Sequence, residues 1–362
     1  MNATLRALLV PALAAGIFCA TGCAGGGLPG STPDEKSVAA AELGRRGQDD
    51  AIPVLVRAIE TEPEVVQQAA VAALGRIGTV AAVEALARFK DHELRSIRTS
   101  VAQALADVEP EAYERAAEVL AEMGPASLPR GPGEDPDLEV RRAIVTAMAV
   151  TKSPPCAPFI VDRIRHEYDE QIRNAAIQTL GRLAEKYDLG ELVGRDEAVA
   201  VLTEVYRTDN EKNRAWAVEA LGKIGGDGAL DVIMQAFDDY DHVTRGKAAV
   251  ALMRLKGRDA IPVLRERLER ETADMPAVVM AHCLALLGET DDAVPFLEDR
   301  VLHASNNFAR AEAARVLREV GRRESMPVLD EAFRTDRDGL VKREAAMSIR
   351  VLRERFPREE PQ

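Results

Sequence analysis

The 362-residue chain has few aromatic side chains and no surplus of positive charge. Aromatic residues make up 4% of it, with a single tryptophan, which disfavours an all-β protein because strands are enriched in aromatic and β-branched residues. Lys and Arg number 47 against 60 Asp and Glu, so no basic surplus is available for nucleic-acid phosphates, and no nucleic-acid partner is expected. The abundant residues are Ala, Leu, Glu and Arg, all of which favour helices.

Long hydrophobic runs are also missing, apart from a short one near the N-terminus. Arg6 is followed by an apolar stretch over residues 7–20, which is too short to cross a hydrocarbon layer of ~30 Å and is typical of a signal peptide. Small residues and a cysteine follow, in Ala20-Thr21-Gly22-Cys23. This segment resembles a bacterial lipoprotein signal, although Leu is commoner than Ala at the position of Ala20. The alternative is an ordinary secretory signal cut near Gly22, which would leave a soluble periplasmic binding protein.

The lipoprotein resemblance implies that residues 1–22 are removed and that Cys23 is lipidated. Residues 23–35 are rich in Gly and Pro and are expected to form a flexible tether. The implied location is the periplasmic side of a bacterial cell envelope, with the outer membrane favoured over the inner because Ala24, not Asp, follows the cysteine. Residues 356–362 are expected to be a disordered tail. Cys156 and Cys283 give no disulfide framework and are expected to be buried small hydrophobes.

An internal repeat of about 32 residues fills residues 36–355. Each copy has a basic residue, a pair of small or apolar residues three and four positions later, and a large apolar anchor residue seven positions later. Successive anchors are 31, 31, 43, 32, 41, 31, 32, 33 and 32 residues apart, so two copies carry insertions of roughly ten residues. The anchors are Leu43, Leu74, Leu105, Met148, Leu180, Leu221, Leu252, Leu284, Leu317 and Ile349.

Each repeat is predicted to form two helices. The second helix has apolar residues at the i, i+3, i+4, i+7 spacing, as in Ala70, Val71, Leu74 and Ile77, and then ends at a glycine such as Gly78. The first helix is predicted to open with a proline in its first turn, ten or eleven residues after the anchor. These prolines are Pro53, Pro158, Pro262, Pro295 and Pro327.

The repeated segments are similar to HEAT repeats, of the type also found in phycobilisome-lyase proteins. The similarity is carried by segments such as Val140-Arg141-Arg142-Ala143-Ile144 and Ala73-Leu74-Gly75-Arg76-Ile77-Gly78. The expected fold is therefore all-α, an α-solenoid (superhelix) of about ten stacked HEAT-like helical hairpins. Small residues three and four positions before each anchor are expected to let neighbouring helices approach closely. The copy at Ala277 lacks its basic residue, so a local irregularity is expected there.

The basic residues seven positions before the anchors predict a structural ladder between repeats. Acids precede several of them, including Asp91, Asp137, Asp169, Asp209 and Asp241, and each guanidinium is expected to fork between acidic turns. The predicted ladder residues are Arg98, Arg141, Arg173, Arg214, Arg245 and Arg310.

A second basic column lies two positions after the anchors, on the expected concave face. It either offsets helix dipoles or contacts an acidic protein partner. Trp216 is either a plug beside the second insertion or an interface anchor, since Trp is enriched at binding hot spots. The column begins at Arg45, and the candidate partner contacts are Trp216, Arg76, Arg182, Lys223 and Arg254.

Two insertions interrupt the repeats, at 124–137 and 185–196. The first is rich in Pro and Gly and cannot be regular structure, and the second is expected to hold a short turn. Either insertion is a neutral surface loop or a contact for a partner.

No catalytic, cofactor or metal-ligand motif is present, and no small-molecule substrate is evident. The favoured hypothesis is a non-enzymatic protein-binding scaffold or adaptor of the bacterial envelope, anchored through Cys23, with its partner along the concave face. The alternative implied by the family resemblance is an accessory or lyase-like factor that helps to attach bilin chromophores.

Overall fold

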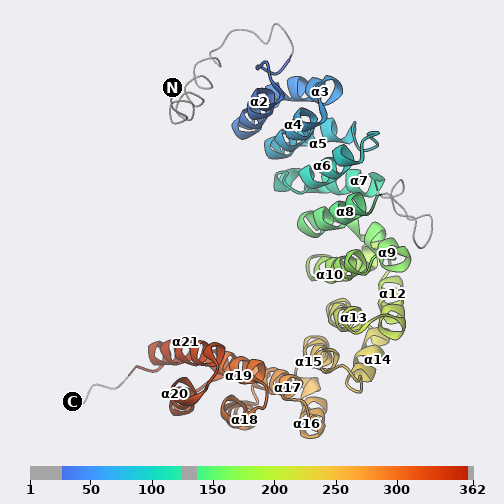
Figure 1. Cartoon of the computed structure of the whole chain (residues 1–362). Coiled ribbons are helices and arrows are strands. Elements are labelled where there is room, and N and C mark those ends of the chain that lie inside the picture. Colours follow the sequence, from blue (N-terminus) through green and yellow to red (C-terminus); the bar gives the residue numbers. More distant parts are fainter. Residues whose placement is uncertain (1–26, 124–136, 358–362) are drawn as a thin grey trace, which may run out of the picture. The chain divides into compact units, whose positions relative to one another are not determined.

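The computed structural model describes residues 27–123 and 137–357, and every regular element in these ranges is helical. No strand occurs in the described part of the chain, so the all-α prediction is confirmed. The chain divides into two compact units, residues 1–179 and 180–362, with helix α10 (Glu170–Lys186) crossing the boundary between them. Each unit is a stack of helical hairpins, as expected for an α-solenoid (Figure 1).

The first unit contains two layers of helices. The second helices of its repeats pack against each other in chain order, and so do the first helices. The second-helix layer consists of α2 (Pro33–Arg46), α4 (Glu64–Ile77), α6 (Arg95–Ala104) and α8 (Leu138–Thr151). The first-helix layer consists of α3 (Ile52–Thr61), α5 (Val80–Ala87), α7 (Tyr113–Met123) and α9 (Cys156–His166).

The second unit repeats this arrangement after the short helix α11 (Leu189–Leu192), which supplies the turn expected in the second insertion. Its second-helix layer consists of α13 (Glu211–Ile224), α15 (His242–Lys256), α17 (Asp274–Leu286), α19 (Asn307–Val320) and α21 (Gly339–Arg355). Its first helices are α12 (Arg195–Thr208), α14 (Asp227–Ala236), α16 (Ile261–Arg270), α18 (Thr290–His303) and α20 (Ser325–Thr335).

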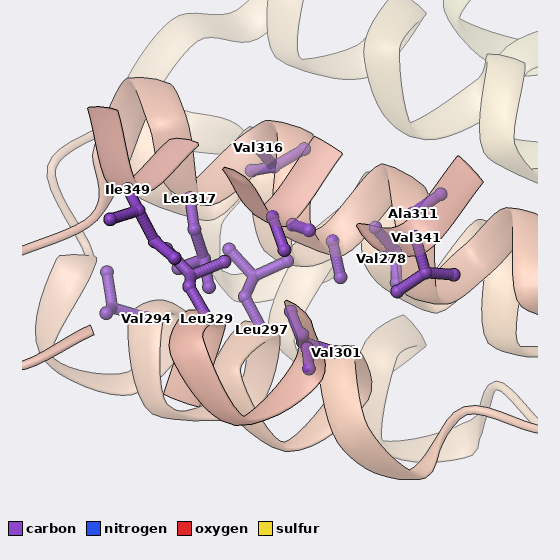
Figure 2. Close-up of a cluster of buried hydrophobic side chains, with 14 of the residues drawn as sticks. Val278, Val294, Leu297, Val301, Ala311, Val316, Leu317, Leu329, Val341 and Ile349 are labelled. Carbon is purple, nitrogen blue, oxygen red and sulfur yellow. The ribbon is translucent and has the colours of Figure 1, made fainter. Parts of the chain in front are cut away.

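The hydrophobic core lies between the two layers. Figure 2 shows part of it in the second unit, where Leu297 of α18, Leu317 of α19 and Leu329 of α20 converge. All three side chains are completely buried, and burying one leucine is worth about 1.5–3 kcal/mol. Every repeat shares this core with its neighbours, so stacking completes an interior that one hairpin could not close alone.

A close approach between second helices also occurs at positions that were not singled out from the sequence. A glycine one position after an anchor faces the alanine one position before the next anchor. A Cβ on Gly75 would lie 2.9 Å from the Cα of Ala104, and a Cβ on Gly222 would lie 2.6 Å from the Cα of Ala251. The small residues three and four positions before the anchor are buried as well, as with Ala70 and Val71, which are fully buried.

Two predicted boundaries differ from the structure. Helix α2 begins at Pro33, inside the predicted tether, because Thr32 and Glu35 form a capping box and Leu28 is buried. Pro295 does not open its helix but lies inside α18, which begins five residues earlier at Thr290. Pro53 and Pro262 do lie in the first turns of α3 and α16.

Candidate functional site

A ladder of charged hydrogen bonds follows the N-terminal turns of the second helices. In α15, Arg245 donates from Nε and Nη2 to the two carboxylate oxygens of Glu271, at 2.7 and 2.8 Å. Its Nη1 donates to the main-chain oxygens of Asp239 and Tyr240, at 2.9 and 3.1 Å. One guanidinium therefore ties the turn of its own repeat to the turn of the next.

We call such a contact between a basic residue and the acid of the next turn a rung. The same rung recurs at Arg310 in α19. Its Nε is 2.7 Å from a carboxylate oxygen of Asp336, and its Nη1 is 2.9 Å from the main-chain oxygen of Ala304. Arg214 forms an equivalent bidentate pair with Asp239, at 3.0 and 3.1 Å. Main-chain groups also hydrogen-bond to these carboxylates. Asp336, for example, accepts from the N–H of Asp338 at 2.8 Å.

Two of these rungs lower the pKa of their carboxyl groups, those of Asp336 and Glu271. The hydrogen bond from Arg310 is the largest influence on Asp336 and holds its pKa below the ordinary value. Burial works to raise the pKa of Glu271, but hydrogen bonds from Arg245 and from the N–H of Ala273 outweigh it and the net shift is downward. Both carboxylates are therefore more stable ionised in the folded chain than in the unfolded chain.

The first unit has its own rungs. Arg98 of α6 donates to Asp137 at 2.8 Å and to the main-chain oxygen of His92 at 2.7 Å. Lys36 donates to Glu62 at 2.7 Å. The most buried rung joins Arg141 of α8 to Glu167, whose side chains are 3% and 0% exposed. Arg173 lies half-buried in the first turn of α10.

The acids that hold the guanidinium groups are mostly not the ones expected from sequence. The residues immediately before the helices act mainly as caps: Asp241 accepts from the N–H groups of Val243 and Thr244, and Asp169 accepts from that of Ile172. The ladder instead uses acids 25 or 26 residues after the basic residue in five of its rungs. These pairs are Lys36–Glu62, Arg141–Glu167, Arg214–Asp239, Arg245–Glu271 and Arg310–Asp336, and this fixed spacing was the signal that could have identified them.

The rung at Ala277 is absent, and its counterpart is absent too. Glu271 lies six residues before Ala277, and the equivalent position six residues before Arg310 is Ala304, which is buried. The turn is held instead by Asp274, whose Oδ2 accepts from the N–H and hydroxyl of Ser305, both at 2.7 Å. The expected irregularity is thus in the ladder, while α17 itself is a continuous helix.

The second basic column is largely neutralised by acids of the same chain. Arg45 is 2.5 Å from Glu42, and Lys223 is 3.2 Å from Glu185 and 3.0 Å from Glu219. Arg254 also pairs with Glu185, at 2.9 Å. Arg76 and Arg182 are exposed residues of α4 and α10.

Trp216 lies on α13 within this charged network. The ammonium group of Lys247 on α15 stands 4.5 Å from the centre of its ring, and Lys247 also pairs with Glu219. The indole is neither fully buried nor fully exposed. Trp216 and Lys247 both stand five positions before their anchors, so this contact joins equivalent places in adjacent repeats.

The two described cysteines are free and buried, as predicted. Burial raises the pKa of Cys156 and raises that of Cys283 to about 12, so neither thiol is ionised near neutral pH. Among the residues described, no three His, Cys, Asp or Glu side chains are grouped to hold a metal ion. Within the same residues, no helix combines the length and apolar character needed to cross a membrane. Cys23 and residues 124–136 of the first insertion lie outside the described ranges.

Three solved structures that align with most of this chain are compared by TM-score and sequence identity. Kap121p bound to Nup53p aligns with a TM-score of 0.53 and 14% identity, over 89% of this chain and 40% of Kap121p. An engineered protein aligns with a TM-score of 0.47 and 19% identity, over 90% of this chain and 96% of its own. The complex of CpcE and CpcF of phycocyanin lyase from Nostoc sp. PCC7120 aligns with a TM-score of 0.34 and 19% identity, over 72% and 96%.

The sequence itself matches one family. No curated protein matches it significantly. The model of HEAT repeats matches residues 28–106, 133–212, 199–277 and 272–350, which is most of the chain and nearly all of the helical region. The chain belongs to the HEAT-repeat family.

Proposed function

We propose that this chain is a non-enzymatic scaffold that binds a protein partner along the second-helix layer of its second unit. The observation that carries the proposal is the position of Trp216, a partly exposed aromatic ring on α13 with Lys247 of α15 against it. Tryptophan is enriched among residues that dominate binding energies, because one ring removes a large apolar area from water. HEAT-repeat membership supports a scaffold role, and Kap121p, which has a similar fold, is bound to Nup53p.

The charges around Trp216 determine which kind of partner segment this surface would bind. Lys223 and Arg254 are already paired with Glu185, and Lys247 with Glu219, so the surface carries both signs and no free basic row. An acidic partner would therefore gain little from the basic column alone. A partner segment with an apolar residue for the indole, flanked by polar groups for these pairs, fits better.

A photo-crosslinking amino acid at position 216 tests this proposal. We expect it to capture one defined partner from cells, whereas the same amino acid in place of Phe333 does not. Phe333 is a suitable control because it is 45% exposed but lies on α20, in the first-helix layer. Equal capture at both positions, or no protein adduct at position 216, would contradict the proposal.

We further propose that the scaffold is held at the bacterial cell envelope by a lipid on Cys23, with the outer membrane favoured. The support is the N-terminal sequence, in which an apolar run is followed by small residues and a cysteine. Palmitate labelling should mark the chain, and Cys23→Ala should abolish the label. The variant should also be lost from the membrane fraction as mature lipoprotein. It should appear as unprocessed precursor or in the soluble fraction. Equal labelling of both forms would rule out this anchor.

A further inference from the structure

We propose that the missing rung at Ala277 is a socket for an arginine side chain supplied by a protein partner. A cavity of about 390 Å³ lies at this place, lined by Ala277 itself and by residues of the turn between α16 and α17. Ala277 occupies the position that carries arginine in α15 and in α19, on either side. The cavity is thus the space that a ladder arginine would fill.

The main-chain acceptors of the missing guanidinium are in place, whereas the acid that would pair with it is replaced by Ala304. Arg98, Arg245 and Arg310 each direct Nη1 to the main-chain oxygens five and six residues before them. The corresponding oxygens for Ala277 belong to Thr272 and Glu271, and both residues line the cavity. Within the described ranges, neither oxygen accepts a hydrogen bond. A guanidinium entering from outside would meet the same pair of carbonyls that the chain uses elsewhere.

The charge of the cavity favours a cation. Glu269, Glu271 and Asp274 line it, against one guanidinium, that of Arg300. Arg300 is already engaged by Asp299 and by Asp274, the latter at 3.2 Å. Glu271 is paired with Arg245, whereas Glu269, exposed at the rim, forms no ion pair with the rest of the described chain.

The geometry selects guanidinium over ammonium. A planar guanidinium can donate to two carbonyls on one edge and to a carboxylate on the other, whereas an ammonium is a compact point charge that keeps its water more strongly. Phe296 forms one wall, and its ring lies 5.3 Å from the guanidinium carbon of Arg300. A flat cation between that wall and the turn would be desolvated without losing its hydrogen bonds. This proposal deepens the proposed function, since it names one chemical group of the partner.

Titration of the 362-residue chain with two blocked tripeptides tests the socket. The probes are acetyl-Gly-Arg-Gly-amide and acetyl-Gly-Lys-Gly-amide, and the readout is the NMR signals of Thr272 and Ala273. We expect the arginine peptide to shift both signals with millimolar affinity, about −4 kcal/mol, and the lysine peptide to bind at least several-fold more weakly. Absence of a shift with the arginine peptide, or equal binding of the two peptides, would overturn the proposal.

Two variants distinguish binding of the peptide in the socket from nonspecific electrostatic attraction to the chain. Ala277→Arg supplies the guanidinium from within the chain, so it should abolish the peptide-induced shifts and raise the melting temperature. Glu269→Gln keeps the cavity open and should weaken binding several-fold. If either folded variant binds the arginine peptide as well as the unchanged chain does, the peptide binds outside the socket and the proposal is wrong. The result does not depend on capture at position 216, so the socket and the scaffold proposal can fail separately.

Discussion

The rung at Arg141–Glu167 in the first unit and the gap at Ala277 in the second unit occupy equivalent places in two repeats. At the first, a bidentate ion pair is almost completely buried, and Arg163, 1% exposed, has a nitrogen 4.0 Å from the same Glu167 carboxylate. At the second, both partners are replaced by alanine, at Ala277 and Ala304. At Ala277, α17 nevertheless packs against α19.

The difference shows which interaction carries the stacking. Since α17 packs against α19 without a guanidinium rung, an arginine rung is not required to join two repeats. The shared hydrophobic core and the hydrogen bonds from Ser305 to Asp274 join them there instead. The ladder fixes the register between neighbouring repeats, because each guanidinium must reach two turns at once. Removing both partners of a pair, as at Ala277 and Ala304, leaves no buried charge behind, whereas removing one partner does.

The largest effect is therefore expected where one carboxylate serves two buried guanidinium groups. Glu167→Ala leaves Arg141 and Arg163 without it and should destabilise the first unit by about 3–5 kcal/mol. Hydrogen exchange of the α8 and α9 amides would report this loss. The control is Glu170→Ala, an exposed residue at the start of α10, which should change protection by less than about 0.5 kcal/mol. Equal effects of the two variants would mean that the buried rung contributes nothing special.

A smaller loss is expected where backbones meet. In Gly222→Ala the new methyl group would lie 2.5 Å from the Cβ and 2.6 Å from the Cα of Ala251, so α13 and α15 must separate, at a cost of about 1–3 kcal/mol. Gly181→Ala is the matched control, because its nearest neighbour, the Cβ of Ala220, would be 3.2 Å away. Urea denaturation should show the larger shift for Gly222. A larger shift for Gly181 would contradict the packing described.

Acid should weaken the rung at Arg310–Asp336 in a defined direction. The folded-state pKa of Asp336 is lowered, so its contribution is fully present above the unfolded pKa of about 3.9 and is lost as pH falls through the folded value. Hydrogen-exchange protection of the α19 and α21 amides, measured relative to the intrinsic exchange rate at each pH, should therefore fall below about pH 4. Asp336→Asn should reduce this pH dependence. An unchanged profile in that variant would show that other carboxyl groups control the acid response.

The smallest effect is expected for an exposed pair of the same charge types. Arg270 and Glu266 are 2.8 Å apart on α16, with side chains 69% and 52% exposed. Solvent screens such a pair, and Arg270→Ala should change stability by no more than about 0.5 kcal/mol in urea denaturation. A loss comparable to that of Glu167→Ala would mean that burial does not separate the two classes of ion pair.

The repeat period, the paired helices and the position of the ladder arginines were predictable because each repeats along the chain. Local capping at Thr32 and the position of Pro295 inside α18 were missed, since a boundary depends on one or two residues and not on a period. The partners of the ladder were mostly misassigned to the nearest acids. Proximity in sequence favoured Asp241 as a partner for Arg245, but the fold brings Glu271 to it from 26 residues away.

The amino-acid order by itself determined an all-α chain of stacked hairpins, because apolar residues recur at helical spacing in segments too small to bury them alone. Only the tertiary structure decided which carboxylate each arginine meets, which glycines let helices touch and where a rung is empty. These features depend on distances between repeats, and such distances exist only after the hairpins have packed.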